Sequence, residues 1–403
     1  MRDDIRDPRH GLWLVFIVLV GINLRPFLTA VGPLAESIRT GTGLGYRGIA
    51  WLTMLPLLIM GAGAFFEPII RRLFGAREAM VGALILVGVG SGLRLVASSG
   101  DLLIATAALC GLGVAVVQSI IPGIIKQRFP HRVAVAAGCY SASLMLGGAM
   151  GAQFTPLLEH WIGGWNEALA WWAAPVLLAL LLAWQIMPAR CPTGGNAAPT
   201  ARLLRRPRTW LLMVCFGLTN TGYAALVAWL PPFYQSMGWS PARSGSLIAI
   251  MSVAQACAAM LLPTLSGRNR DRRRWLGLTL GLQAAGFAAF AFWPEAAPHA
   301  WVIAVGMGLG GTFALMLVVA LDHLPRPDQA GALSAFMLGG GFIIAAIAPW
   351  LIALLRQISG DFTSGWLAQL AGVILLLALT VRLAPDGYAA AMGETAKEGT
   401  TTK

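Results

Sequence analysis

Charged residues are scarce in this chain, and this scarcity sets its class. Only 11% of the 403 residues are Asp, Glu, Lys or Arg, and 57% are hydrophobic. A soluble protein uses about 25% charged residues to cover its surface. A chain with so little charge cannot cover a globular exterior with polar groups, so the composition predicts an integral membrane protein.

Motifs for enzymatic or metal chemistry are also missing. The five cysteines have no CxxC spacing, and four of them lie in apolar runs: Cys110, Cys139, Cys191, Cys215 and Cys257. The five histidines are dispersed without an HExxH pattern. These spacings indicate neither a disulfide framework nor a zinc site. Without a Walker A loop, a GxSxG nucleophile or paired carboxylates in the apolar runs, we expect no enzyme and no cofactor. No loop between the apolar runs is longer than the stretch 189–208. Such short loops argue against a receptor with large soluble domains.

Long apolar runs dominate what is present. A helix needs roughly 20 apolar residues to cross about 30 Å of hydrocarbon. Twelve spans are expected, at 11–34, 48–70, 78–97, 102–124, 133–157, 168–188, 209–234, 241–264, 275–293, 299–321, 330–355 and 364–384. The expected fold is an all-α membrane protein of two pseudo-symmetric six-helix bundles. The domains are then a bundle at 11–188, a cytoplasmic linker at 189–208, a bundle at 209–384 and a tail at 385–403, with 393–403 disordered.

The positions of Lys and Arg predict the orientation. Of 29 such residues, 23 fall at the termini, in the linker and on one set of loops; the opposite loops hold Arg39, Arg47, Arg243 and Arg356, and the spans hold Arg25 and Arg94. Because cytoplasmic loops are enriched in Lys and Arg, both termini and the linker are expected in the cytoplasm. The net charge of +12 is then an orientation signal, so no nucleic-acid partner is expected. The first span is too long for a cleaved signal peptide.

The second half of the chain repeats marks of the first. Trp13 and Asn23 correspond to Trp210 and Asn220. At a constant offset of 193, Ser141, Gly147, Gly148 and Pro156 correspond to Ser334, Gly340, Gly341 and Pro349. Duplicated halves joined by a linker are typical of secondary transporters that alternate access around a central site.

Several stretches are similar to a known family. They are "NLRPFLTAVGPL" in the first span, "LTMLPLL" in the second, "IIPGIIKQRFPHRVAVAAGCYS" across the fourth and fifth, "AWLPPFYQSMGWSPARSGSL" across the seventh and eighth, and "GALSAFMLGGGFIIAAIAP" in the eleventh. The chain resembles the major facilitator superfamily and, within it, the cyanate and 2-nitroimidazole transporter (CynX/NimT) family. The resemblance implies a secondary transporter of the bacterial inner membrane that uses no cofactor. Proton coupling is the default for this fold, and a monomer is expected.

The chain departs from the family pattern at two places. The superfamily loop after the second span usually reads like G-x-x-x-D-R-x-G-R-R, whereas this chain has "FFEPIIRRLFGARE". Family members often carry Gln and Tyr in the eleventh span, where this chain has Leu338 and Phe342. Since those positions bear on ligand choice, the substrate of the family cannot simply be transferred.

Arg25 is the main candidate for substrate binding. It lies about halfway along the first span, where an arginine facing lipid would cost about 2.5–3.5 kcal/mol or more. In a two-bundle transporter the first and seventh spans line the central cavity, so Arg25 can bind the negative pole of a substrate. The alternative is a guanidinium that holds backbone carbonyls in place. No Asp or Glu lies in the middle of a span, which argues against export of cationic drugs and favours an anionic, polar or neutral solute.

Other polar and aromatic residues within the spans are secondary candidates for substrate binding. They are Asn23, Phe27, Gln118, Tyr140, Asn220, Tyr223, Trp229 and Gln255. Asn23 and Asn220 could instead bond each other across the two-fold axis, and the aromatic residues could serve packing. Arg94 lies near the outer end of the third span, where snorkelling would explain it. Glu67, Arg71, Arg72 and Arg77 are expected to form a cytoplasmic latch that holds the outward-open state, or only to fix the topology.

Two functions follow from the sequence. The first is a secondary active transporter that moves a small anionic or polar organic solute by alternating access, with Arg25 reading its negative pole. The solute would be cyanate-like, or a small carboxylate or heteroaromatic compound. The second is an efflux pump for neutral or weakly acidic heteroaromatic compounds such as nitroimidazoles. The expected partners are the small-molecule substrate, the lipid bilayer and protons.

Overall fold

The fold is entirely helical in the part of the chain that the structure describes. The structure is a computed structural model, and it describes residues 8–129, 133–187, 203, 205–266, 271–324 and 327–392. Apolar runs of this length form helices because only a helix satisfies all of its backbone hydrogen bonds without water.

The first half of the chain forms nine helical elements within the described residues. They are α1 (Pro8–Asn23), α2 (Pro26–Thr29), α3 (Ala35–Thr42), α4 (Tyr46–Phe74), α5 (Ala76–Gly92), the short 3₁₀ turn η2 (Leu93–Val96), α6 (Gly100–Arg128), α7 (Val133–Ile162), α8 (Trp165–Ala170) and α9 (Ala173–Ile186), counting η2 with α5. The second half forms six long helices, α11 (Pro207–Gln235), α12 (Pro241–Ser266), α13 (Arg273–Phe292), α14 (Pro298–Asp322), α15 (Pro327–Ser359) and α16 (Thr363–Thr380), followed by η3 (Pro385–Gly387) and α17 (Tyr388–Ala391).

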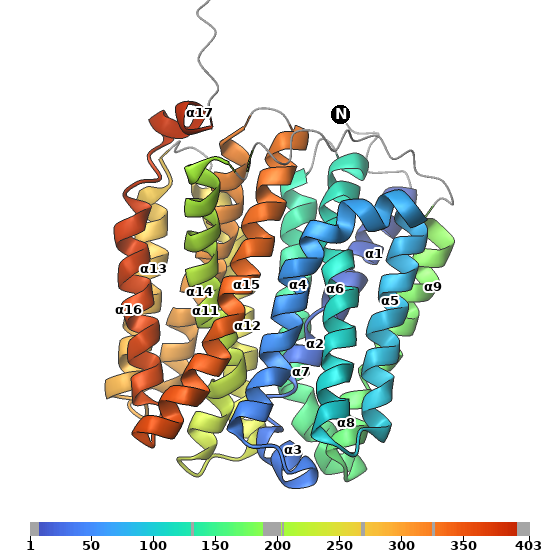
Figure 1. The fold of residues 1–403 in the computed structure, drawn as a ribbon, viewed down its shortest axis with the longest axis vertical. Coiled ribbons are helices and arrows are strands. Elements are labelled where there is room, and N and C mark those ends of the chain that lie inside the picture. The colour runs from blue at the N-terminus through green and yellow to red at the C-terminus, as the bar shows by residue number, and fades with distance from the viewer. Residues whose placement is uncertain are drawn as a thin grey trace, which may run out of the picture.

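The two halves lie side by side as separate bundles (Figure 1). Across their boundary α4 packs along α15 and α7 packs along α12. Helix α17 lies at one end of the molecule, called here the terminal end, and α3 lies at the other, called the α3 end (Figure 1). The interface between the bundles runs between these two ends, as a transport pathway requires.

Most of the expected spans are present, with two differences. Among the described residues, ten helices are long and apolar enough to cross a membrane. The expected span at 48–70 is not one of the ten. Helix α4 meets the same criterion only when it is taken together with α3, and the two helices are bent by 114° relative to each other. The expected span at 133–157 is a helix, α7, but is not among the ten. The count of twelve spans therefore stays a prediction.

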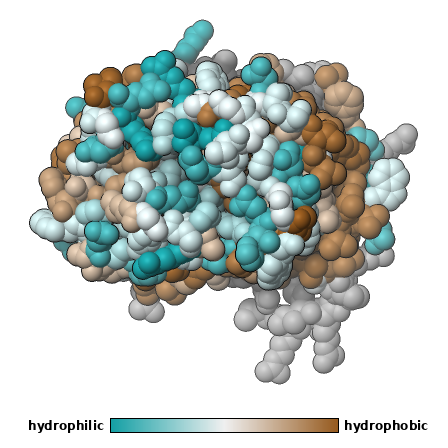
Figure 2. All heavy atoms as spheres, turned by 90° about the horizontal axis from the view of Figure 1, so that it is seen from below, coloured by the Kyte–Doolittle hydropathy of each residue, from teal (hydrophilic) through white to brown (hydrophobic). Residues whose placement is uncertain are grey.

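The flanks of the molecule are apolar and its α3 end is polar. Large apolar side chains that are exposed on the helices include Val15, Leu177, Leu181, Trp184, Leu265, Leu278 and Ile374. Viewed from the α3 end, hydrophilic residues cover much of the face, and hydrophobic residues gather along its sides (Figure 2). Exposed apolar surface on this scale marks a membrane-facing protein.

The predicted domain boundaries remain largely untested. Most of the expected linker, 189–208, and the segment 393–403 lie outside the described residues. The first part of the expected tail is folded, because η3 and α17 cover residues 385–391. Tyr388 anchors α17, since its ring stacks on His323 with the centres 3.8 Å apart.

His323 is held neutral at this anchor. The Arg208 Nε–H donates to His323 Nε2 at 3.0 Å, so the other ring nitrogen carries the proton and donates to the Val319 carbonyl at 2.6 Å. Burial, assisted by the nearby Arg208 charge, lowers the pKa of His323 to about 4. The contact ties the start of α11 to the end of α14 and to α17.

Candidate substrate-binding site around Arg25

The first span is interrupted at Arg25. Helix α1 ends at Asn23 and α2 begins at Pro26. Pro26 has no N–H to continue the helix and disfavours helical geometry in the residue before it. Arg25 stays in the right-handed helical region with ψ −26°, but its φ of −117° departs from that of a regular helix. The sequence "NLRPF" therefore breaks the helix where the arginine stands.

Glycines on α7 accommodate this break. A Cβ at Gly147 would clash with the backbone of Ile22, and a Cβ at Gly151 would lie 2.7 Å from the Pro26 Cα. Only glycine lets two backbones approach this closely. These glycines therefore seat the interrupted part of the first span against α7.

The Arg25 guanidinium is buried, and two of its three nitrogens lack a hydrogen-bond partner among the described residues. Arg25 is 5% exposed, and neither Nε nor Nη1 has a partner among the described residues. Its Cζ atom lies 4.7 Å from the centre of the Tyr223 ring, which belongs to α11 in the other bundle. A buried charge without hydrogen bonds costs several kcal/mol, so this arrangement leaves room for an anionic group to complete it.

Two further unpartnered hydroxyls lie near Arg25. The buried Tyr140 hydroxyl on α7 has no described partner, and the Arg25 charge acts on it electrostatically. Ser252 on α12 is 1% exposed and its Oγ also lacks a partner. A Cβ built on Gly148 would lie 3.5 Å from Arg25 Cβ and 3.8 Å from Ser252 Oγ. Arg25, Tyr140, Tyr223 and Ser252 thus form a polar group from both bundles, called here the Arg25 cluster.

Sequence reasoning missed Ser252, although a signal for it exists. Ser252 lies three residues before Gln255 on α12, and residues three apart share a helix face. Gln255, which was expected to bind substrate, is 3% exposed. Gln118 is half-buried in α6.

The two repeat-related asparagines bond backbone rather than each other. Asn23 Nδ2 donates to the Leu19 carbonyl at 2.8 Å and to the Pro175 carbonyl at 3.3 Å. Asn220 Nδ2 donates to the Phe216 carbonyl at 2.9 Å. Both amides thus bond the carbonyl four residues earlier, and the shared pattern agrees with the internal repeat.

Phe27 faces a second arginine, and this corrects the expectation for Arg94. The Arg94 Nη1–H donates to the Phe27 carbonyl at 3.0 Å, and its Cζ lies 5.9 Å from the Phe27 ring. Arg94 is 0% exposed, so the expectation that it snorkels is wrong. The η2 turn directs it inward, where Asn166 Nδ2 holds that turn by donating to the Arg94 and Ala97 carbonyls at 3.2 and 2.9 Å. Arg94 supports the segment that follows Arg25.

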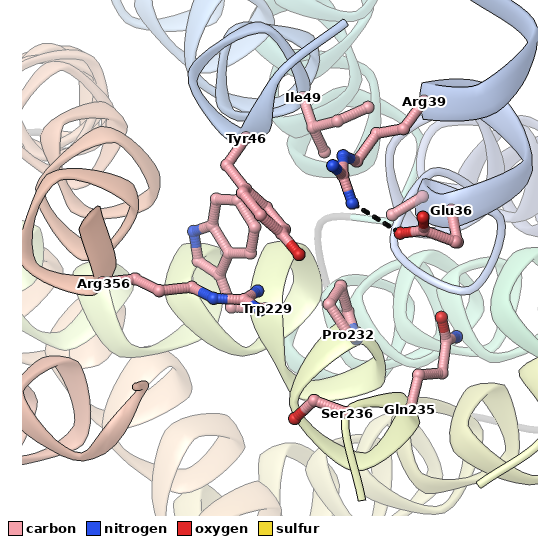
Figure 3. Close-up of a pocket in the computed structure, with 10 residues that line it drawn as sticks. Glu36, Arg39, Tyr46, Ile49, Trp229, Pro232, Gln235, Ser236 and Arg356 are labelled. Carbon is pink, nitrogen blue, oxygen red and sulfur yellow. Dashed lines mark hydrogen bonds and ion pairs between the residues drawn. The ribbon is translucent and has the colours of Figure 1, made fainter. Parts of the chain in front are cut away.

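Trp229 lies apart from the Arg25 cluster. Its indole N–H donates to the Pro349 carbonyl at 2.8 Å, and the side chain is 0% exposed. It forms one wall of a cavity at the α3 end (Figure 3). Trp229 therefore closes the space between α11 and α15 in this structure.

The expected latch is described at one residue only. The side chains of Glu67, Arg71 and Arg72 lie outside the described residues. Arg77 Nη2 donates to the Trp184 carbonyl in the last turn of α9 at 2.7 Å, and its Cζ lies 4.5 Å from the Trp184 ring. A cation at a helix C-terminus is favourable, so Arg77 here serves its own bundle. The latch stays a prediction.

Neither a metal centre nor an ion pair accompanies the Arg25 cluster in the described residues. No group of three His, Cys, Asp or Glu side chains that could hold a metal occurs there. The ion pairs of the described part, Arg39–Glu36, Arg272–Asp322 and Arg273–Asp271, lie on other elements. The cluster offers hydrogen-bond donors, an aromatic face and one positive charge.

The fold is shared with solved transporter structures. A bacterial homologue of the human lysosomal transporter Spinster, in an inward-facing and occupied conformation, superposes with a TM-score of 0.73 at 18% identity, covering 94% of this chain and 97% of that one. A D-xylose–proton symporter superposes with a TM-score of 0.75 at 14% identity, covering 92% and 97%. At such identities the likeness shows the fold alone.

Sequence comparison places the chain in a family. Residues 14–349 match the model of the Major Facilitator Superfamily. The cyanate transport protein CynX of Escherichia coli (strain K12) is 42% identical, covering 92% of this chain and 97% of that protein. The 2-nitroimidazole transporter of the same strain is 30% identical, covering 89% and 91%. The chain therefore belongs to the major facilitator superfamily and, within it, to the cyanate and 2-nitroimidazole transporter (CynX/NimT) family of membrane transporters.

Proposed function

We propose that this protein moves a small anionic or polar organic solute across the bacterial inner membrane, with Arg25 binding the negative pole of the solute. Cyanate, the solute named for a 42% identical relative, is the first candidate, and small carboxylates belong to the same class. The protein is a member of a transporter family, so the proposal concerns its substrate and mechanism.

One observation carries the proposal. The Arg25 guanidinium is buried between the bundles, and within the described part of the chain neither its Nε and Nη1 nor the nearby hydroxyls of Tyr140 and Ser252 have a hydrogen-bond partner. A planar guanidinium pairs with the negative end of a small solute through parallel N–H bonds. Bound anion would satisfy the donors of Arg25, Tyr140 and Ser252 together, and this offsets the cost of burying them.

Alternating access is supported by where the bundles touch. At the α3 end, Gln235 Nε2 of α11 donates to the Pro33 carbonyl at 3.0 Å, and a Cβ at Gly32 would clash with the Val227 carbonyl. Such contacts would close a pathway between Arg25 and the α3 end. We propose that they open when the bundles rock, that the terminal end faces the cytoplasm because Lys and Arg concentrate there, and that the protein works as a monomer driven by protons.

The second candidate is efflux of neutral or weakly acidic heteroaromatic compounds. The Tyr223 ring beside Arg25 offers a face on which a planar ring can stack, and a 30% identical relative is named as a 2-nitroimidazole transporter. Phe342, at a position where relatives often carry tyrosine, is buried against Phe216 with ring centres 6.0 Å apart.

Ligand-dependent thermal stability tests the two candidates. Detergent-purified protein is heated with cyanate, formate, benzoate, 2-nitroimidazole or the cationic drug ethidium, each over a range of concentrations. A ligand that binds the folded state raises the melting temperature as its concentration increases. We expect stabilisation by cyanate or formate, and its loss in Arg25→Ala. Stabilisation by 2-nitroimidazole alone would favour the second candidate, and stabilisation by ethidium alone would overturn both.

A further inference from the structure

A second group of cationic side chains lies at the α3 end, apart from the Arg25 cluster. These side chains surround a cavity of about 160 Å³ between the bundles, which is called here the outer cavity. From the first bundle the cavity is lined by residues of α3 and α4, and from the second by residues of α11 and α15 (Figure 3). Its mouth therefore lies across the boundary that must open for a solute to pass.

Two arginines from opposite bundles meet on one tyrosine in the outer cavity. The Cζ atom of Arg39 lies 4.1 Å from the centre of the Tyr46 ring, and that of Arg356 lies 3.9 Å from it. Figure 3 shows the two guanidiniums reaching this ring from different elements. Like charges repel, so a pair of guanidiniums held this close favours an anion between or beside them.

The charges of the cavity do not cancel. Glu36 is the one carboxylate among the lining residues, and it already pairs with Arg39 Nη1 at 2.7 Å. Arg356 has no ion pair among the described residues, and the Nε of Arg39 has no hydrogen-bond partner there. The outer cavity therefore carries one net positive charge and unsatisfied guanidinium donors.

Three other donors that line the cavity already make hydrogen bonds. The Trp229 indole donates to the Pro349 carbonyl. Gln235 Nε2 donates to the Pro33 carbonyl and to Ser244 Oγ. Ser236 Oγ donates to the Phe233 carbonyl. Among the lining residues this leaves the guanidiniums and the Tyr46 hydroxyl as donors, and the guanidiniums select for negative charge.

The volume and position of the cavity fit a small transported anion. Since one water occupies about 30 Å³ in the liquid, the space holds an anion of a few heavy atoms. Trp229 in its wall lies six residues beyond Tyr223 on α11, about 9 Å along the helix axis. Helix α11 thus leads from the outer cavity to the Arg25 cluster.

We propose that the outer cavity is a second binding site for the same small anion, where Arg39 and Arg356 capture it before it reaches Arg25. The inference rests on the proposed function for its choice of ligand. When the bundles separate at the α3 end, Arg356 leaves the Tyr46 ring, and its guanidinium is free to bind the anion. Tyr46 then closes behind the solute when the bundles rejoin.

Binding stoichiometry tests this proposal without a transport assay. Equilibrium dialysis of radiolabelled cyanate against the detergent-purified full-length protein should give two binding sites per chain. Arg356→Gln should weaken one of them by about tenfold or more, as expected for loss of a charged hydrogen bond, while Arg25→Ala should abolish the other. Arg356→Lys, which keeps the charge, should retain two sites.

A matched control separates the cavity from general surface charge. Arg243 also lies at the α3 end, with its Cζ 3.7 Å from the Trp239 ring, but it does not line the cavity. Arg243→Gln should therefore keep both sites. A single site that is lost only in Arg25→Ala would overturn the outer site and leave the proposed function standing. A single site that is lost only in Arg356→Gln would support the outer site and overturn the proposed function of Arg25.

Transport in oriented proteoliposomes gives a second, directional test. With cyanate supplied at the α3 face, Arg356→Gln should raise KM by about tenfold. With cyanate supplied at the terminal face, KM should be unchanged, because the anion then meets Arg25 first. An equal rise at both faces, or none at either, would contradict the proposal.

Discussion

The Cζ atom of Arg25 lies 4.7 Å from the centre of the Tyr223 ring, although 198 positions of sequence separate the two residues. The repeat explains how they meet. At the offset of 197 that equates Asn23 with Asn220, Tyr223 corresponds to Pro26, the residue that breaks the first span. Helix α11 continues through this point because it has tyrosine where α1 meets a proline. One half thus supplies a broken helix with a charge, and the other an intact helix with a ring.

Cyanate binding should require both the charge of Arg25 and the planar geometry of its guanidinium. Arg25→Ala should weaken cyanate binding by at least about tenfold, since hydrogen bonds to charged groups contribute about 1.5–3 kcal/mol. Arg25→Lys should be nearly as damaging, because an ammonium cannot form two parallel bonds. Equilibrium binding of radiolabelled cyanate measures both, with melting curves to verify folding. Wild-type affinity in Arg25→Lys would leave only a requirement for charge.

The ring of Tyr223, rather than its hydroxyl, should matter to Arg25. Tyr223→Phe keeps an aromatic face under the guanidinium and should bind cyanate like the wild type. Tyr223→Leu removes the cation–π contact, which contributes about 1–2 kcal/mol when desolvated, and should bind several-fold more weakly. The same binding assay compares the pair. Equal weakening in both variants would show that the hydroxyl contacts the solute.

A methyl group at Gly147 should destabilise the protein. Gly147→Ala would place a Cβ against the Ile22 carbonyl where the first span is interrupted, and such overpacking costs about 1–3 kcal/mol. Gly138, on the same helix α7, has nothing within 4 Å of a built Cβ, so Gly138→Ala is the matched control. Thermal melting should show a lower Tm for Gly147→Ala and no decrease for Gly138→Ala. Similar melting of the two would mean that α7 can move aside.

The anchor at His323 should make stability depend on pH. The pKa of His323 is lowered from 6.5 to about 4 in the folded protein, so the unfolded chain binds its proton first. The contribution of neutral His323 to stability is then fully present above about pH 6.5 and is lost as the pH falls towards 4. Melting temperatures of wild type and His323→Asn are compared between pH 7.5 and 5. Above about pH 6.5 the two should depend on pH in the same way, and below it the melting temperature of the wild type should decrease more steeply. Parallel curves throughout would show that His323 is not the titrating group.

The positions of the spans could be predicted from sequence because burial in lipid depends mainly on the length and apolarity of a run. The observed helices α5, α6 and α11 to α16 coincide with predicted spans. Details of the ends could not be predicted. The 114° bend between α3 and α4 follows Gly43, which has φ +71°. A glycine in the sequence permits such a turn but does not require it.

Arg25 could be identified from sequence because a charge in the middle of an apolar run is costly wherever it points. Its neighbours could not be identified in the same way. Ser252 looks like any helical serine until α12 packs against α7 and brings it to Gly148. Trp229 was a candidate for substrate binding or for packing, and the sequence could not indicate that its indole N–H donates to the Pro349 carbonyl on α15.

The sequence by itself determined the membrane class, the internal repeat and the single arginine that interrupts the first span. These follow from composition, from spacing along one chain and from the cost of an isolated charge in hydrocarbon. Only the tertiary structure decided that Arg94 turns inward, that Ser252 joins Arg25, and that Arg39 and Arg356 meet on Tyr46. Contacts between the bundles depend on how helices far apart in the chain pack and rotate, and local sequence patterns do not specify that geometry.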